Sequence, residues 1–203
     1  MKWNYKQIPT FLFYSRFNVF FHSLLIIGCM IFIVIGSCSR SASFAERLTI
    51  GKVLDRSNQS ISKDNDVKEI NHILSTVYHA IEIKDLSVLS DLIDAERGIW
   101  VDLKAHKTKN EFVTDIADYN GYVNSYYLNT AAIKARTGEK DQKSLYDVIS
   151  ESQLIKADFF FQGDECEVRF TIEKPESMTD ESYRFNNAYF VKDNGKWFLF
   201  RLP

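Results

Sequence analysis

The segment KADFFFQGDECEVRFTIE, residues 156–173, decides the fold. Gly163-Asp164 divides it into two runs, and the second run alternates apolar with polar residues, with the apolar set at Cys166, Val168, Phe170 and Ile172. Alternation with a period of two is typical of a strand that has one buried face. We therefore expect an antiparallel hairpin over residues 156–173, with its turn at Gly163.

A second hairpin follows it. Tyr183–Lys192 leads through Asp193-Asn194-Gly195 into a run that ends near Leu202. Asn-Gly between two apolar runs is a strong signal for a tight hairpin turn. On the last strand, we expect the face that holds Phe198, Phe200 and Leu202 to pack against the core.

The residues before these strands have helical periodicity. Asp64 or Asp66 can cap a helix that begins near Val67. Apolar residues then recur every three or four positions, at Val67, Ile70, Ile73, Leu74, Val77, Ala80 and Ile81. A short helix is expected after Asp85. Another is expected from the capping-box pair Thr108 and Glu111 to about Asp118. Ile99, Val101 and Leu103 alternate as in a strand, and Asn120-Gly121 marks a turn. After this turn we expect a strand over Tyr122–Leu128 and a short helix over Ser144–Ser150.

Helices followed by antiparallel strands predict an α+β domain, with N-terminal helices packed on one face of a curved antiparallel sheet. This order resembles the cystatin-like cone of the nuclear transport factor two-like superfamily, and the stretch Asp193–Arg201 carries most of the resemblance. The resemblance implies a cavity at the open end of the cone. Gly98–Asp102, His106 and the last hairpin also resemble a group of bacterial predicted lipoproteins of unassigned activity, which supplies no active site.

The N-terminus has the order of a secretory signal. Met1–Asn18 is basic and aromatic, and Leu24–Ile35 is almost purely apolar. The next residues, Ile35-Gly36-Ser37-Cys38, resemble the lipobox of bacterial lipoproteins. The resemblance implies cleavage before Cys38 and lipid attachment to its thiol, with acyl chains such as palmitate. The alternative is an uncleaved signal anchor, although the apolar run is shorter than the about 20 residues of a bilayer span.

These features divide the chain into three parts. We expect a signal peptide over residues 1–37, a lipidated cysteine and flexible serine-rich tether over 38–63, and a single α+β domain over 64–203. Within the tether, Phe44–Leu54 is more apolar and is the part suited to local docking. The expected location is the cell membrane or outer membrane, with the domain outside the cytoplasm. Ser39 after the cysteine, by the same resemblance, favours the outer membrane.

Net charge and cysteine content restrict the kinds of partner and cross-link that we expect for this chain. The formal net charge is −2, and residues 1–38 hold three basic residues and no acidic one, so the rest of the chain is more acidic still. An acidic domain repels phosphate backbones, which argues against nucleic-acid binding. The expected partners are the membrane, through the lipid anchor, and an envelope protein or a small ligand. Cys166 is expected to be a buried free thiol, with no disulfide.

Motifs that resemble catalytic or metal sites are incomplete. Glu69-Ile70-Asn71-His72 has the di-iron form without a second copy. His72 and His79, seven residues apart on one helix, are roughly 10 Å apart, too far to share a metal. Ser60-Ile61-Ser62-Lys63 has the Ser-x-x-Lys form without its companion motifs. We therefore expect no metal and no cofactor.

Two clusters remain as candidate sites. Asp102 with His106 is the best acid/base pair, but the alternation of the segment predicts that Asp102 faces solvent beside Lys104. The second cluster is aromatic, and we expect it to serve strand packing rather than binding; it comprises Tyr119, Tyr122, Tyr126 and Tyr127.

The sequence thus favours a membrane-anchored cell-envelope lipoprotein with a non-catalytic binding or structural domain. The alternative is a small-molecule enzyme or carrier that uses a cone-shaped cavity, and a weaker third possibility is a signal-anchored accessory protein. The abundance of aromatic residues favours a filled core over an open catalytic cavity. We assign no catalytic residue, and Cys38, as the lipid attachment point, is the one site residue.

Lipidation of Cys38 gives the first testable prediction. Intact-mass measurement of the membrane-extracted protein should show loss of residues 1–37 and added acyl mass on Cys38. A Cys38→Ala variant, the matched control, should lack the acyl mass. A wild-type mass that still includes Met1–Ser37 would support the uncleaved signal anchor instead.

Overall fold

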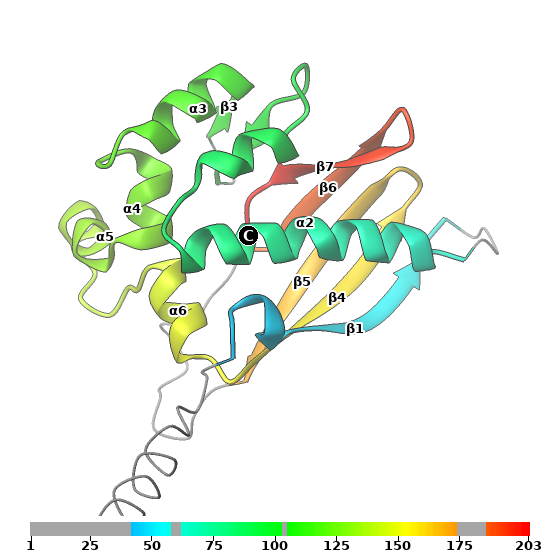
Figure 1. The fold of residues 1–203 in the computed structure, drawn as a ribbon, viewed down its shortest axis with the longest axis horizontal. Coiled ribbons are helices and arrows are strands. Elements are labelled where there is room, and N and C mark those ends of the chain that lie inside the picture. The colour runs from blue at the N-terminus through cyan, green and yellow to red at the C-terminus, as the bar shows by residue number, and fades with distance from the viewer. Residues whose placement is uncertain (1–41, 58–61, 103–104, 174–185) are drawn as a thin grey trace, which may run out of the picture. The chain divides into compact units, whose positions relative to one another are not determined.

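A 19-residue helix, α2 (Asp64–Glu82), lies across one face of a β-sheet (Figure 1). The structure is a computed structural model that describes residues 42–57, 62–102, 105–173 and 186–203, all within one compact unit, Ala42–Pro203. Acidic Asp64 and Asp66 in the first turn complement the helix dipole. The predicted apolar stripe of α2 is confirmed, because all its members are buried: Val67, Ile70, Ile73, Leu74, Val77, Ala80 and Ile81.

In the described residues, seven strands form one open sheet in the order β1-β4-β5-β6-β7-β2-β3. Both predicted hairpins are present and together form an antiparallel meander. β1 pairs with β4 in parallel, and β2 with β7 in parallel. The α+β class is therefore confirmed, but the sheet is mixed rather than antiparallel. The strands are β1 (Leu48–Asp55), β2 (Ile99–Trp100), β3 (His106–Lys107), β4 (Leu154–Gln162), β5 (Glu165–Glu173), β6 (Ala188–Asp193) and β7 (Lys196–Arg201).

The edge strand β1 corrects the expected tether. The prediction of a flexible segment over residues 38–63 is wrong for Leu48–Asp55, which pairs with β4. Just before it, the Arg47 guanidinium donates to the backbone oxygens of Ile149, Ser150 and Ser152 at 2.8–3.0 Å. Every residue of β1 is partly or fully exposed, so backbone pairing holds the strand and no apolar alternation marks it in the sequence.

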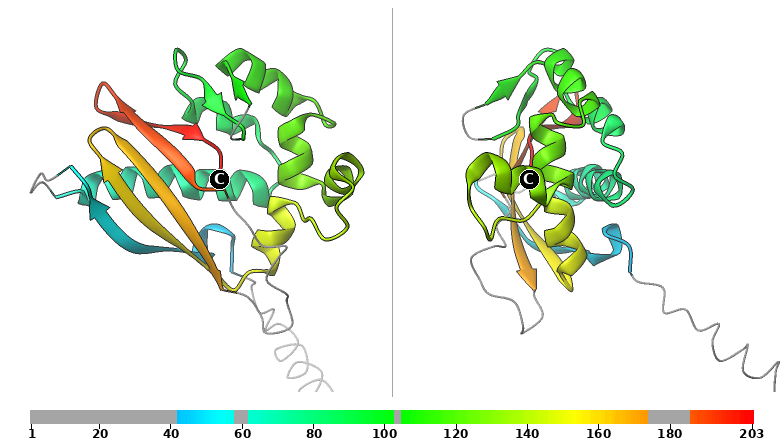
Figure 2. Two further views of the ribbon diagram at one scale, coloured as in Figure 1. Left: turned by 180° about the vertical axis from the view of Figure 1, so that it is seen from behind. Right: turned by 90° about the vertical axis from the view of Figure 1, so that its left-hand side faces the viewer.

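The last strand packs with the opposite face from the one predicted. Trp197 and Leu199 are buried toward α2, whereas Phe198 and Phe200 are half-buried on the other face, and of the three expected core residues Leu202 alone is buried. Both faces of β7 carry apolar residues, so the pattern did not determine which one faces the helix. Figure 2 shows the sheet from behind, with α2 covering its far face.

The core between α2 and the sheet is filled by aromatic rings, with Phe159, Phe161, Phe190 and Trp197 almost fully buried. Cys166 is also fully buried and is a free thiol. Burial raises its pKa to about 12, so the thiol stays protonated in the folded chain. The prediction of a buried free cysteine is confirmed.

Helices α4, α5 and α6 gather at the C-terminal end of α2, and α3 lies above them beside β3 (Figure 1). The capping box of Thr108 and Glu111 and the helix that starts after Ser144 are confirmed. The strand expected over Tyr122–Leu128 is wrong, because this segment is helix α4. The carboxylate of Asp115 accepts from the backbone nitrogens of Tyr122 and Val123 at 2.9 Å and caps it. The helical elements besides α2 are η1 (Ala45–Arg47), η2 (Ser87–Leu92), α3 (Lys109–Ala117), α4 (Tyr122–Leu128), α5 (Thr130–Thr137) and α6 (Leu145–Glu151).

Within the ranges that the structure describes, no helix combines the length and the apolar character needed to cross a bilayer.

The orientation of β7 can be tested with two truncations. Leu199→Ala should lower the free energy of unfolding by roughly 2–5 kcal/mol, because it leaves a cavity in the core. Phe200→Ala should lower the free energy of unfolding by a smaller amount, although it removes more atoms, because the Phe200 side chain is already half-exposed to solvent. Urea unfolding of both variants measures the difference, and a larger loss for Phe200→Ala would contradict this assignment of faces.

Candidate functional site

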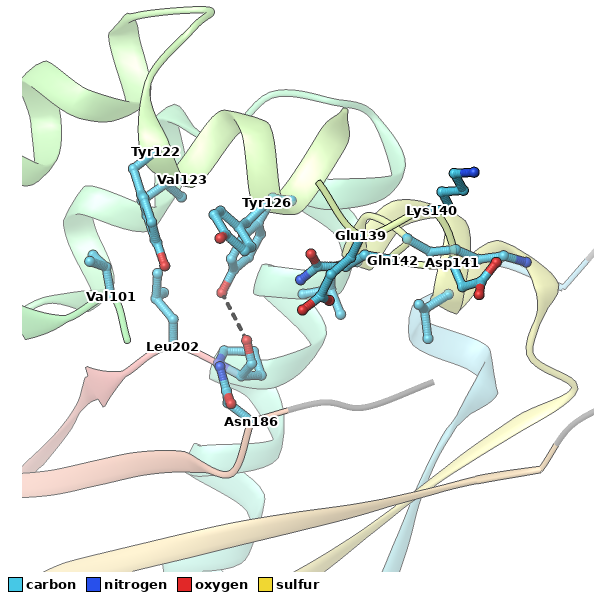
Figure 3. A pocket seen from close by; sticks show the side chains of 15 residues that line it. Val101, Tyr122, Val123, Tyr126, Glu139, Lys140, Asp141, Gln142, Asn186 and Leu202 are labelled. Carbon is cyan, nitrogen blue, oxygen red and sulfur yellow. Dashed lines mark hydrogen bonds between the residues drawn. The ribbon is translucent and has the colours of Figure 1, made fainter. Parts of the chain in front are cut away.

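A cavity of about 610 Å³ lies where the short helices meet the C-terminal end of β7. Its wall is formed by α4, by the loop 139–143, by the start of α6 and by Leu202 and Pro203 (Figure 3). The volume is in the range of small-molecule sites, about 300–1,000 Å³. The resemblance to a cone implied a cavity, but the sequence did not predict its lining, because Tyr122–Leu128 was expected to be a strand and no role was assigned to the loop 139–143.

Three tyrosines of α4 line the cavity. The rings of Tyr122 and Tyr126, one helical turn apart, stack with centroids 4.4 Å apart. Tyr127 is buried, and its hydroxyl donates to the backbone oxygen of Pro203 at 3.5 Å. Tyr119, the fourth member of the predicted cluster, is 75% exposed and does not line the cavity. Tyr122, Tyr126 and Tyr127 therefore form a cavity wall on a helix rather than part of a strand.

Asp102 supports this wall from the neighbouring segment. Its carboxylate accepts one hydrogen bond from the hydroxyl of Tyr122 and one from the backbone nitrogen of Ala105, each at 2.8 Å. Burial, and then the hydrogen bond to Asp102, raise the pKa of Tyr122 well above the ordinary value of a phenol. Burial likewise raises the pKa of Tyr127. Tyr122 and Tyr127 are thus held neutral, as hydrogen-bond donors.

The candidate acid/base pair of Asp102 and His106 is not supported by these contacts. The Nε2 atom of His106 lies 2.8 Å from the backbone oxygen of Arg97, and its ring packs edge-on against Trp100. Asp102 and His106 therefore have different partners. The prediction that Asp102 faces solvent is also wrong, because the side chain is half-buried under Tyr122; Lys104 lies outside the described residues.

The other candidate motifs have no site around them. Glu69, His72 and His79 are exposed along α2, and the described part of the chain contains no group of three residues suited to hold a metal. Lys63 forms ion pairs with Asp55 and Asp66. Ser60, Ile61 and the lipobox cysteine, Cys38, lie outside the described residues.

The loop 139–143 supplies the polar part of the cavity wall. In Figure 3 the polar ends of Glu139 and Gln142 lie on the side that faces Tyr126, whereas Lys140 points away. Lys143 forms an ion pair with Glu151. The Oε1 atom of Gln142 is buried and has no hydrogen-bond partner among the described residues. Sequence reasoning missed this loop because a short polar run after Gly138 is typical of any surface turn.

No family model, curated protein or solved structure matches this chain. Its functional class therefore depends on the cavity, the fold and the N-terminal sequence.

The tyrosine wall leads to a prediction for alkaline pH. In the folded chain the pKa of Tyr122 is raised, so its hydroxyl stays protonated above about pH 10. In the unfolded chain the same hydroxyl loses its proton above about pH 10. The resulting stability is fully present below that pH and is lost as pH rises toward the folded pKa. Tyr122→Phe removes this ionisation, so its free energy of unfolding should fall less steeply above about pH 10.

Urea unfolding at a series of alkaline pH values measures this slope. Tyr119→Phe, at an exposed tyrosine outside the cavity, is the control and should keep the wild-type slope. An unchanged slope for Tyr122→Phe would contradict the burial of its phenol.

Proposed function

We propose that this chain is a membrane-anchored cell-envelope lipoprotein whose folded domain is a non-catalytic binding module for a small ligand. The ligand occupies the cavity that Tyr122 and Tyr126 line. We further propose that the domain is a variant of the cystatin-like cone, with the cavity at its open end. The long helix across one sheet face and the position of the cavity at the end of β7 support this proposal.

The observation that carries the binding role is the composition of the cavity wall. An aromatic platform and a few polar groups on a loop are typical of a small-molecule site. The best acid in the neighbourhood, Asp102, is engaged by Tyr122 and by the backbone nitrogen of Ala105, and the imidazole of His106 is engaged elsewhere. These contacts argue against Asp102 and His106 as a general acid/base pair, and the aromatic wall of the cavity supports a binding role.

The anchoring half of the proposal rests on Ile35-Gly36-Ser37-Cys38 at the end of an apolar run. Several acyl chains give stable attachment, which a single chain does not. On this proposal, the folded domain begins close to the membrane, since Arg47 already binds α6 and strand β1 starts at Leu48.

The cavity is tested with three probes of one shape and different charge: 2-phenylethylamine, 2-phenylethanol and phenylacetate. Ligand-observed NMR on the full-length protein in detergent should detect binding of at least one probe. Tyr126→Ala should abolish this binding, because it removes half of the stacked platform. Tyr119→Ala, the matched control, should keep it.

Two results would contradict this function. One is the absence of binding for all three probes, and the other is equal binding by wild type and a folded Tyr126→Ala. Chemical conversion of a bound probe would instead support the alternative, an enzyme that uses the same cavity.

A further inference from the structure

We infer that the ligand of the tyrosine cavity is a small organic cation that carries N–H donors, such as a primary or secondary ammonium. This inference rests on the proposed binding function and specifies its ligand. Three groups on the cavity wall point to it independently: the stacked tyrosines, the Glu139 carboxylate and the buried Oε1 atom of Gln142.

The tyrosines give the first argument. The face of an aromatic ring is electron-rich and attracts cations within about 6 Å of its centroid. Tyr122 also donates its hydroxyl proton to the carboxylate of Asp102, which increases the electron density of its ring. The stacked pair of Tyr122 and Tyr126 thus favours a positive group and disfavours an anion.

Charge on the loop gives the second argument. Four charged residues line the cavity: Glu139, Lys140, Asp141 and Lys143. Lys143 is paired with Glu151, and Lys140 points away from the tyrosines (Figure 3). Asp141 also points away from them. The carboxylate of Glu139 has no ion-pair partner among the described residues and lies on the cavity side, so a cation in the cavity gains a favourable interaction with it.

Gln142 gives the third argument and restricts the kind of cation. Its Oε1 atom is a buried acceptor without a donor among the described residues. A buried acceptor that lacks a hydrogen bond carries the full cost of its desolvation, and a ligand N–H relieves that cost when the Gln142 amide turns its oxygen into the cavity. A quaternary ammonium has no N–H, so it leaves Oε1 unsatisfied and should bind less tightly than a primary amine of similar size.

The test compares affinities of the full-length protein for 2-phenylethylamine, 2-phenylethanol, phenylacetate and the N-trimethyl derivative of the amine. The amine should bind tightest, by about tenfold over the alcohol, which corresponds to roughly 1.4 kcal/mol. Phenylacetate should bind weakest, and the trimethylated amine should lose several-fold relative to the primary amine. Titration by ligand-observed NMR gives all four dissociation constants.

Matched variants assign the effect to the named groups. Glu139→Gln should remove most of the preference for the amine over the alcohol. Asp141→Asn, the same change of charge two residues along the loop, should preserve that preference. Gln142→Met keeps the size of the side chain but removes the acceptor. It should reduce the advantage of the primary amine over its trimethyl derivative.

Each outcome bears on a different claim. Equal binding of amine and alcohol, or tighter binding of phenylacetate, overturns the cation inference and leaves the binding function intact. Binding of none of the four probes overturns the binding function as well. An equal effect of Asp141→Asn and Glu139→Gln would attribute the preference to the net charge of the loop, and the proposed contact with Glu139 would then be wrong.

Discussion

The carboxylate of Asp66 joins the start of α2 to the last hairpin of the sheet. Its Oδ1 atom accepts from Nε1 of Trp197 at 2.9 Å and from Nζ of Lys192 at 2.7 Å, and Lys63 lies close to Oδ2. Burial raises the pKa of Asp66, but the bonds from Lys192 and Trp197 outweigh it and hold the pKa below its usual range. Because Trp197 must reach this carboxylate, the β7 face that bears Trp197 and Leu199 has to face the helix. The register of β6 against β7 then places Phe190 and Leu199 in the core.

Sequence periodicity predicted those elements whose burial is one-sided. The sequence predicted the stripe of α2 and the alternation from Cys166 to Phe170 because one face of each element is exposed to solvent. β7 has apolar residues on both faces, so periodicity could not determine its orientation, and a hydrogen bond to a distant helix did. β1 was missed for a different reason, because neither of its faces is buried. Its backbone pairs with β4 while its side chains stay largely exposed, so a segment such as Ile50–Leu54 resembles a linker.

The candidate site was predicted in part. The sequence identified the tyrosine cluster and Asp102, but it paired Asp102 with His106 instead of Tyr122. A strand over Tyr122–Leu128 would have separated Tyr122 from Tyr126 by four residues of extended chain, whereas a helix stacks them. The deciding contact is the carboxylate of Asp115, which caps α4 from the preceding helix. Glu139 and Gln142 belong to a polar loop whose role is visible once α4 and α6 are in place.

The burial of Cys166 affects how the chain behaves while it folds. The proposed export delivers the protein to a compartment where thiols are readily oxidised. In the folded domain this thiol is inert, because its pKa is about 12 and it is fully covered. Cys166 is buried by the neighbouring strands β4 and β6 and by α2 above the sheet. Its burial therefore requires contacts between residues more than a hundred positions apart in the sequence. Before that, the cysteine is an ordinary reactive thiol. On the proposed export, the time that the sheet takes to dock on the helix would therefore set how long Cys166 is exposed to disulfide formation between chains.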